Sequence, residues 1–128
     1  MFELDGLDHV ALAVQNVEQS AAWYVNVLGF ERRYEGMWGG VPVFVGKGKT
    51  ALALFPAPQD EASLPARRSP GQILHLALRA DRPNFIAAQQ ELINRGIAFH
   101  FQDHEVSHSI YFQDPDGTKL EITTYELT

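Results

Sequence analysis

Bulky apolar residues alternate with small or polar residues in two stretches of the chain, residues 8–14 and 74–80. The alternating sets are Val10, Leu12 and Val14 against His9, Ala11 and Ala13, and Leu74, Leu76 and Leu78 against His75, Ala77 and Arg79. A period of two is typical of a strand, whose successive side chains point to opposite faces. We expect each bulky face to pack on a helix. The methyl groups of the opposite face leave space, and one imidazole from each stretch points into that space.

A helical stretch follows each predicted strand and ends at a glycine. Asn16 is expected to cap the first helix, with Gln19 three residues later, and Gly29 to end it. Asp81 is expected to cap the second helix and Gly96 to end it. The distance from histidine to glycine is 20 residues in the first stretch and 21 in the second. The chain therefore contains an internal repeat.

Three short strands are expected after each helix. Their predicted ranges are 30–34, 41–45 and 50–55 in the first copy, and 98–101, 109–112 and 119–124 in the second. Each copy therefore has the order β-α-β-β-β, which gives an α+β protein. We expect a single domain over residues 1–128, with module 1 at about 4–56, a linker at about 57–71 and module 2 at about 72–126.

The last predicted strand turns a carboxylate toward the same space. Leu120 and Ile122 form its apolar face, so Glu121 is expected to point away from the helix. With His9 and His75, this residue supplies two imidazoles and one carboxylate. These are the donors of a facial metal triad, which leaves coordination positions open. Singly, each His could be a hydrogen-bonded core residue and the Glu a solvated edge residue. Their matching positions in the repeat favour the metal site.

Other polar and aromatic residues have less definite interpretations. Tyr111 is expected on the polar side of its strand, facing the same space. His100, His104 and His108 lack the register of the repeat, and His104 and His108 are expected to be polar loop residues. Trp38 lies between glycines at an expected hairpin tip, where it could also close over a ligand.

Composition limits the partners and the compartment. The 128 residues carry 10 Lys and Arg against 16 Asp and Glu, a net charge of −6. This acidic balance argues against binding to nucleic acid or to an anionic membrane. The chain has no cysteine, which excludes disulfides and every thiolate site. No apolar run approaches the ~18 residues of a membrane span, so a cytoplasmic protein is expected.

These residues together resemble the vicinal oxygen chelate superfamily, which includes glyoxalase I, bleomycin-resistance proteins, extradiol dioxygenases and fosfomycin-resistance thiol transferases. The resemblance runs from Leu7 to Tyr125 and rests on four motifs. They are Leu7-Asp8-His9-Val10-Ala11-Leu12, Trp23-Tyr24-Val25-Asn26-Val27-Leu28-Gly29-Phe30, Leu74-His75-Leu76-Ala77-Leu78 and Tyr111-Phe112-Gln113-Asp114-Pro115-Asp116-Gly117-Thr118-Lys119-Leu120-Glu121. This combination is specific for the fold and not for the reaction, because the fold hosts many reactions.

The resemblance implies a cupped, partly open mixed β-sheet barrel of two βαβββ modules, with the helices outside. It also implies a divalent metal on His9, His75 and Glu121, and a homodimer. Fe²⁺ or Mn²⁺ is favoured by ligation through two nitrogens and one oxygen, with Zn²⁺ or Ni²⁺ as alternatives.

Departures from the family pattern narrow the chemistry. Glyoxalase I has a further Glu ligand at the end of the first module, and counting along the repeat places Leu54 there, with Ala53 beside it. Three positions that bind phosphonate in fosfomycin enzymes hold Ala11, Phe101 and Glu105, which supply neither cation nor hydroxyl. The His acid/base that extradiol dioxygenases carry before their second His ligand is absent from residues 59–74.

The sequence therefore favours a metal-dependent enzyme of the glyoxalase or dioxygenase type. The metal would chelate and polarise neighbouring oxygens of a small organic substrate, Tyr111 would orient the substrate or stabilise an oxyanion, and His108 would carry a proton. The alternative is a non-catalytic protein of the bleomycin-resistance type that sequesters a drug or metabolite, with Trp23, Tyr34, Trp38 and Phe44 as its aromatic surface. A fosfomycin-type thiol transferase is a weaker alternative.

Overall fold

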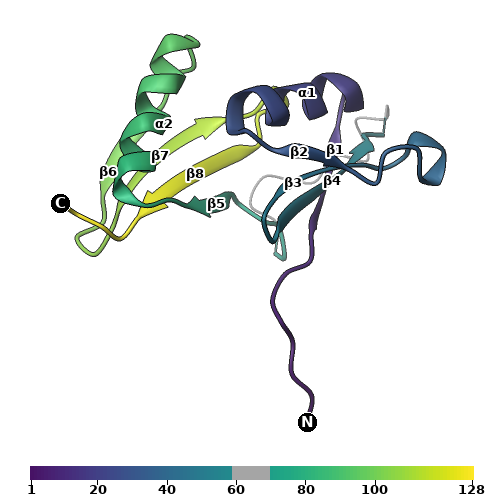
Figure 1. Cartoon of the computed structure of the whole chain (residues 1–128), viewed down its shortest axis with the longest axis horizontal. Helices are drawn as coiled ribbons and strands as arrows, with labels where there is room; N and C mark the ends of the chain where they lie inside the picture. Colours follow the sequence, from purple (N-terminus) through teal and green to yellow (C-terminus); the bar gives the residue numbers. More distant parts are fainter. Residues whose placement is uncertain (59–69) are drawn as a thin grey trace. The chain divides into compact units, whose positions relative to one another are not determined.

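A computed structural model describes residues 1–58 and 70–128 of the chain. The described residues form two compact units, and the boundary between them falls between Leu64 and Pro65. Most of the predicted linker, residues 59–69, lies outside the described residues. Each unit holds one helix and one four-stranded mixed sheet (Figure 1).

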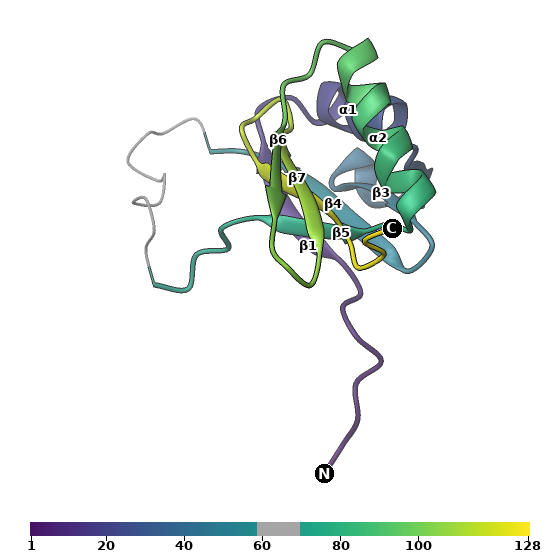
Figure 2. The same ribbon diagram turned by 90° about the vertical axis from the view of Figure 1, so that its left-hand side faces the viewer.

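The first unit has the predicted β-α-β-β-β order. Its elements are β1 (Val10–Val14), α1 (Val17–Leu28), β2 (Glu31–Arg33), the short 3-10 turn η1 (Trp38–Gly40), β3 (Val43–Lys47) and β4 (Thr50–Pro56). The sheet order is β1-β4-β3-β2, with β1 parallel to β4 and the other pairs antiparallel. Residues before β1 form an extended segment that leads to the N-terminus (Figure 2).

The second unit repeats this order and topology. Its elements are β5 (Leu76–Arg79), α2 (Arg82–Asn94), β6 (His100–Asp103), β7 (His108–Gln113) and β8 (Lys119–Thr124). The sheet order is β5-β8-β7-β6, again with one parallel pair, β5 and β8. The helix α2 lies on one side of this sheet in both views (Figures 1 and 2). The structure thus confirms the α+β class and the two βαβββ modules.

Local signals in the sequence explain where the helices begin and end. The Oδ1 atom of Asn16 accepts the backbone N–H of Gln19 at 2.9 Å, and Asp81 caps α2 in the same way through Asn84. Gly29 ends α1 with φ of 71°, a left-handed conformation that glycine adopts without strain. The predicted caps Asn16, Asp81 and Gly29 are therefore confirmed, whereas the C-cap of α2 is Arg95, one residue before the predicted Gly96.

The apolar face of each sheet packs against the helix of its own unit. In the first unit, Val14 of β1, Tyr24 of α1 and Leu54 of β4 are fully buried. In the second unit, Phe85 of α2 and Ile110 of β7 occupy the corresponding core. The opposite face carries the small and polar residues, as the alternation predicts. The strands β1 and β5 are shorter than expected, so His9 and His75 each lie directly before the first strand of their unit.

Candidate functional site

Three neighbouring strands of the second unit place polar side chains on the face of the sheet opposite α2. Ala77 of β5 is paired with Glu121 of β8, and Glu121 is paired with Tyr111 of β7. Residues paired across strands point to the same face of a sheet. The register therefore brings Glu121 and Tyr111 side by side, as the sequence predicts, and His75 directly precedes β5 on the same side.

His75 and Glu121 are in direct contact. The Nε2 atom of His75 lies 2.9 Å from Oε1 of Glu121. The other carboxylate oxygen, Oε2, accepts the Oγ–H of Ser109 at 2.6 Å, and Ser109 is fully buried. Glu121 itself is only 8% exposed. A buried carboxylate is stable only with partners for its charge, and an imidazole and a hydroxyl are the partners here.

Tyr111 lies beside this pair and is held by a histidine from a loop. Its hydroxyl group is 2.9 Å from Nε2 of His104, and the ammonium group of Lys119 lies 4.8 Å from the centre of its ring. Partial burial raises the pKa of Tyr111, and the negative charge of Glu121 and a hydrogen bond with it raise that pKa further. A hydrogen bond with Ser109 lowers the pKa of Tyr111 and so opposes this rise. The phenol is therefore kept protonated and can donate a hydrogen bond.

His9 lies in the first unit, on the side of the sheet away from α1. Its Nδ1 atom is 2.8 Å from the carboxylate of Asp8, and its ring meets the ring of Phe44 at 5.2 Å in an edge-on geometry. Within residues 1–58 and 70–128, no three His, Asp or Glu side chains form a cluster that could hold a metal ion. The structure thus brings together two of the three predicted ligands, and His9 belongs to the other compact unit.

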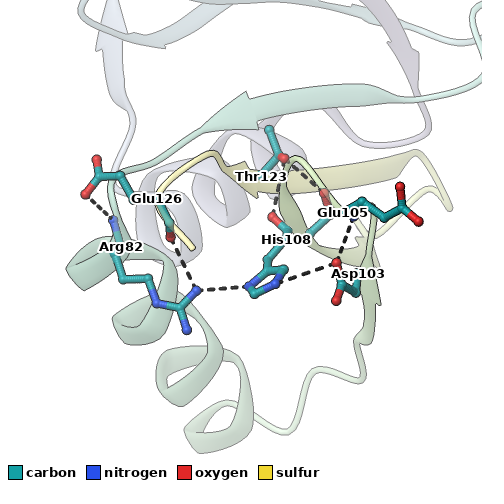
Figure 3. Close-up of polar contacts among 7 residues, drawn as sticks. Arg82, Asp103, Glu105, His108, Thr123 and Glu126 are labelled. Atoms are coloured by element: carbon teal, nitrogen blue, oxygen red, sulfur yellow. Dashed lines mark hydrogen bonds and ion pairs between the residues drawn. The ribbon is translucent and has the colours of Figure 1, made fainter. Parts of the chain in front are cut away.

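His108 lies on the opposite face of β7 from Tyr111. Its Nδ1 atom is 3.0 Å from Nη1 of Arg82, at the start of α2, and its Nε2 atom is 3.7 Å from Asp103 (Figure 3). Tyr111 is the third residue after His108 in β7. Side chains that are an odd number of residues apart in a strand point to opposite faces. The structure therefore does not bring His108 to Tyr111, and the loop position expected for His108 is wrong because it begins β7.

His104 is the residue at this site that the sequence did not reveal. It follows β6, and the turn that it begins is closed by the hydrogen bond from its N–H to the carbonyl oxygen of Ser107, at 2.9 Å. This turn directs the imidazole back to Tyr111. Periodicity says nothing about such a turn. The spacing of seven residues between His104 and Tyr111 does not indicate a contact either.

The strand register corrects the position in the first unit that corresponds to Glu121. Counting along the repeat gives Leu54, but Leu54 is fully buried on the helix side of the sheet. Ala11 of β1 is paired with Ala53 of β4, as Ala77 is paired with Glu121. Ala53 is therefore the equivalent position, and the count is wrong by one residue because the first unit is one residue shorter between its glycine and this strand.

A match to the model of a known protein family identifies the family of this chain. Residues 6–122 match the model of the Glyoxalase/Bleomycin resistance protein/Dioxygenase superfamily. The chain belongs to this superfamily. The match therefore extends over both units.

Individual superfamily members show how far the likeness goes. The chain is 30% identical over 122 residues to a catechol-2,3-dioxygenase of Bacillus subtilis (strain 168), an alignment that covers 91% of this chain and 40% of that protein. The chain thus spans less than half the length of this relative. It is 28% identical over 120 residues to the glutathione transferase FosA of Serratia marcescens, covering 93% of this chain and 80% of that one.

A solved member of the superfamily has the same fold. The crystal structure of a glyoxalase/dioxygenase from Nostoc punctiforme superposes with a TM-score of 0.76 at 26% identity, and the match covers 94% of this chain and 90% of that one.

In the described part of the chain, neither helix has the length and apolar character needed to cross a membrane.

Proposed function

We propose that this superfamily member is a metal-dependent enzyme that acts on a small organic substrate with two neighbouring oxygens. The observation that carries the proposal is the contact between His75 and the buried carboxylate of Glu121. An imidazole nitrogen and a carboxylate oxygen suit Fe²⁺, Mn²⁺, Zn²⁺ and Ni²⁺, so the donor chemistry fits a divalent ion. His9 is the proposed third ligand, and Fe²⁺ or Mn²⁺ the favoured metal.

The metal, when bound, would polarise the two substrate oxygens as a Lewis acid. Ser109 fixes one oxygen of Glu121 and so orients the carboxylate, a role that outer hydrogen-bond partners of metal ligands commonly have. Tyr111, kept protonated, donates a hydrogen bond to a substrate oxygen on which negative charge develops. His104 positions that hydroxyl group through the contact at 2.9 Å.

The first test is the metal content of purified protein after removal and reloading of divalent ions. We expect one ion per chain in the wild type and its loss in His9→Ala, His75→Ala and Glu121→Gln. His100→Ala is the matched control, because His100 is an exposed histidine of β6 outside the proposed ligand set. Unchanged metal content and thermal stability in His9→Ala would contradict the proposal.

The second test separates the two enzymatic reactions. A metal-dependent colour change with a catechol, followed by ring-opened product, supports dioxygenase chemistry. Turnover of a methylglyoxal–thiol adduct without any reaction of catechols supports glyoxalase chemistry. The proposal also includes a homodimer and a cytoplasmic location, and light scattering on the purified protein tests the oligomeric state.

A non-catalytic binding protein is the second candidate, and one observation favours it. The aromatic side chains of Tyr34, Trp38 and Phe44 are in mutual ring contact beside His9. A surface of this kind can hold a drug-like molecule without any metal. Tight binding of a ligand to metal-free protein, together with no turnover after metal loading, would favour sequestration.

A thiol transferase that acts on a phosphonate is the weaker candidate. The ring of Phe101 packs against Phe85 and His108, and Phe85 belongs to α2, so Phe101 faces the helix side of the sheet. Ala11 and Glu105 likewise provide no positive charge. Phosphonate recognition needs cations and hydrogen-bond donors, so these positions argue against it.

A further inference from the structure

The second unit has an open depression beside Tyr111, here called the β6–β8 depression. Its volume is about 670 Å³, which lies within the range of small-molecule sites. Residues 97–100 form one side of it, and residues 111–114 and Lys119 form the other. All of these residues belong to the second unit, so the depression is a feature of that unit by itself.

The depression lies where the strands β6 and β7 part. The ladder between them ends at the pair of His100 and Tyr111, whereas β7 continues to Gln113. Residues 97–99 lie outside the ladder, between α2 and β6. The edge of the sheet beyond this last pair therefore leaves room for a ligand.

The depression borders the proposed metal site along the same face of the sheet. Gln113 of β7 is paired with Lys119 of β8, and Tyr111 is paired with Glu121. Side chains two residues apart on a strand share a face, and so do side chains of a cross-strand pair. Gln113 and Lys119 therefore lie on the face of Tyr111 and Glu121, one step closer to the start of β8.

Lys119 supplies the positive charge of the depression. Its ammonium group lies 4.8 Å from the centre of the Tyr111 ring, and this cation–π contact holds it beside the depression. In the described parts of the chain, Lys119 takes part in no ion pair. Its charge is therefore available to a ligand.

The acidic residue of the lining does not offset this charge. Asp114 is only 5% exposed, and its Oδ1 atom accepts the backbone N–H groups of Asp116 and Thr118 at 2.9 and 2.8 Å. These bonds hold the carboxylate in the turn between β7 and β8. The groups left to meet a ligand are donors, the ammonium group of Lys119 and the side-chain amide of Gln113.

We propose that the β6–β8 depression binds an anionic group of the substrate, a carboxylate or a phosphate, through Lys119 and the amide N–H groups of Gln113. Hydrogen bonds from an ammonium group to such an anion are among the strong ones. Two residues of a strand span about 7 Å, so the anion would lie about 7 Å from the substrate oxygens held near Glu121. The inference rests on the proposed function and specifies its substrate class, a molecule with two neighbouring oxygens at one end and an anion at the other.

The first experiment uses metal-free protein and simple anions, so its result does not depend on the metal. Acetate, inorganic phosphate and acetamide are titrated while NMR follows the side-chain amide signals of Gln113. Acetamide has the shape of acetate without its charge. We expect a saturable shift with at least one anion and none with acetamide, and the tighter anion identifies the group. The absence of a shift with both anions would overturn the inference.

Lys119→Gln tests the role of the cation. The affinity for the anion is expected to fall about tenfold, because one charge-assisted hydrogen bond is lost, and Lys119→Arg is expected to retain it. Lys49→Gln is the matched control, since Lys49 is an exposed residue of the turn between β3 and β4 and its replacement removes the same charge. Full affinity in Lys119→Gln, or an equal loss in Lys49→Gln, would overturn the inference.

The second experiment connects the depression with the metal site. Calorimetry on metal-loaded protein compares 5,6-dihydroxyhexanoate, which has a diol at one end and a carboxylate at the other, with its neutral amide. We expect the acid to bind about tenfold more tightly than the amide, and this preference to disappear in Lys119→Gln. Equal affinities in the wild type would overturn the inference.

Metal content measured on the same samples keeps the two proposals apart. Bound metal without a preference for the acid contradicts only the inference. Binding of acetate or phosphate by a protein that takes up no metal contradicts only the proposed function.

Discussion

At the scale of single residues, the environment of Glu121 determines what the second unit can do. This carboxylate is buried, and its two oxygens contact different partners, His75 and Ser109. Each partner matters because an unpaired buried carboxylate is costly. The residue-scale predictions therefore concern two hydroxyl groups that interact with it, those of Ser109 and Tyr111.

Ser109→Ala is expected to lower the free energy of unfolding by about 1–3 kcal/mol, because it leaves an oxygen of Glu121 without its buried donor. Urea denaturation measures this loss, and metal affinity is expected to fall about 10- to 100-fold in the same variant. Ser20→Ala is the matched control: among the described residues, the buried Ser20 hydroxyl has no hydrogen-bond partner. Its removal is expected to leave stability unchanged or raised. Equal losses in both variants would argue against a role for the Ser109 hydrogen bond.

Tyr111 makes stability depend on pH at the alkaline end of the range. Its pKa is raised in the folded state by partial burial and by Glu121, so the unfolded chain loses this proton first, near pH 10. Stability is fully present below that pH and falls as the pH rises through the folded-state pKa. Unfolding measured at a series of alkaline pH values is expected to show a smaller fall in Tyr111→Phe than in the wild type.

The same phenol reports on the proposed metal. A divalent ion on Glu121 offsets part of the negative charge that raises the pKa of Tyr111, so adding metal is expected to lower this pKa. Tyrosinate absorbance during an alkaline titration, as the difference between wild type and Tyr111→Phe, measures it. A tyrosinate titration that metal leaves unchanged would place the ion away from Glu121.

At the scale of elements, the sequence predicts what local rules control. Alternation identified the faces of β1 and β8, and capping residues identified the ends of α1, because both depend on neighbours along the chain. The contact of His104 with Tyr111 was missed because the turn at residues 104–107 sets it. The equivalence of Ala53 and Glu121 was missed by one residue because it depends on strand register, which counting along the chain does not fix.

The cap of α1 gives a prediction at this scale. Asn16→Ala removes the acceptor for the Gln19 N–H and is expected to cost about 1 kcal/mol of stability. Asn26→Ala is the matched control, because Asn26 is an exposed residue within α1, where alanine is the better helix former. It is expected to be neutral or to stabilise by about 0.5 kcal/mol. Chemical denaturation of both variants compares the same substitution at a cap and inside a helix.

At the scale of the whole molecule, the proposed metal would couple the two units energetically. Both tryptophans, Trp23 and Trp38, belong to the first unit, so tryptophan fluorescence reports on that unit. Two proposed ligands, His75 and Glu121, belong to the second unit. The location of the reporters and of these ligands makes the coupling measurable.

Metal at a hundred times its dissociation constant is expected to stabilise the protein by about 2.7 kcal/mol, and to raise the melting temperature seen by tryptophan fluorescence. In Glu121→Gln this rise is expected to disappear, although the substituted residue lies outside the unit that carries the tryptophans. Circular dichroism on the same samples follows both units. Persistence of the metal effect on fluorescence in Glu121→Gln would mean that the first unit binds the ion by itself.

Ala53, opposite Ala11 in the first unit, has an electrostatic consequence for the proposed chemistry. Two neutral imidazoles and one carboxylate leave a divalent ion with one uncompensated positive charge. An ionised substrate oxygen would balance that charge, whereas a glutamate in place of Ala53 would balance it beforehand. At the proposed metal site, a methyl group at this position would thus favour an anionic substrate over a neutral one.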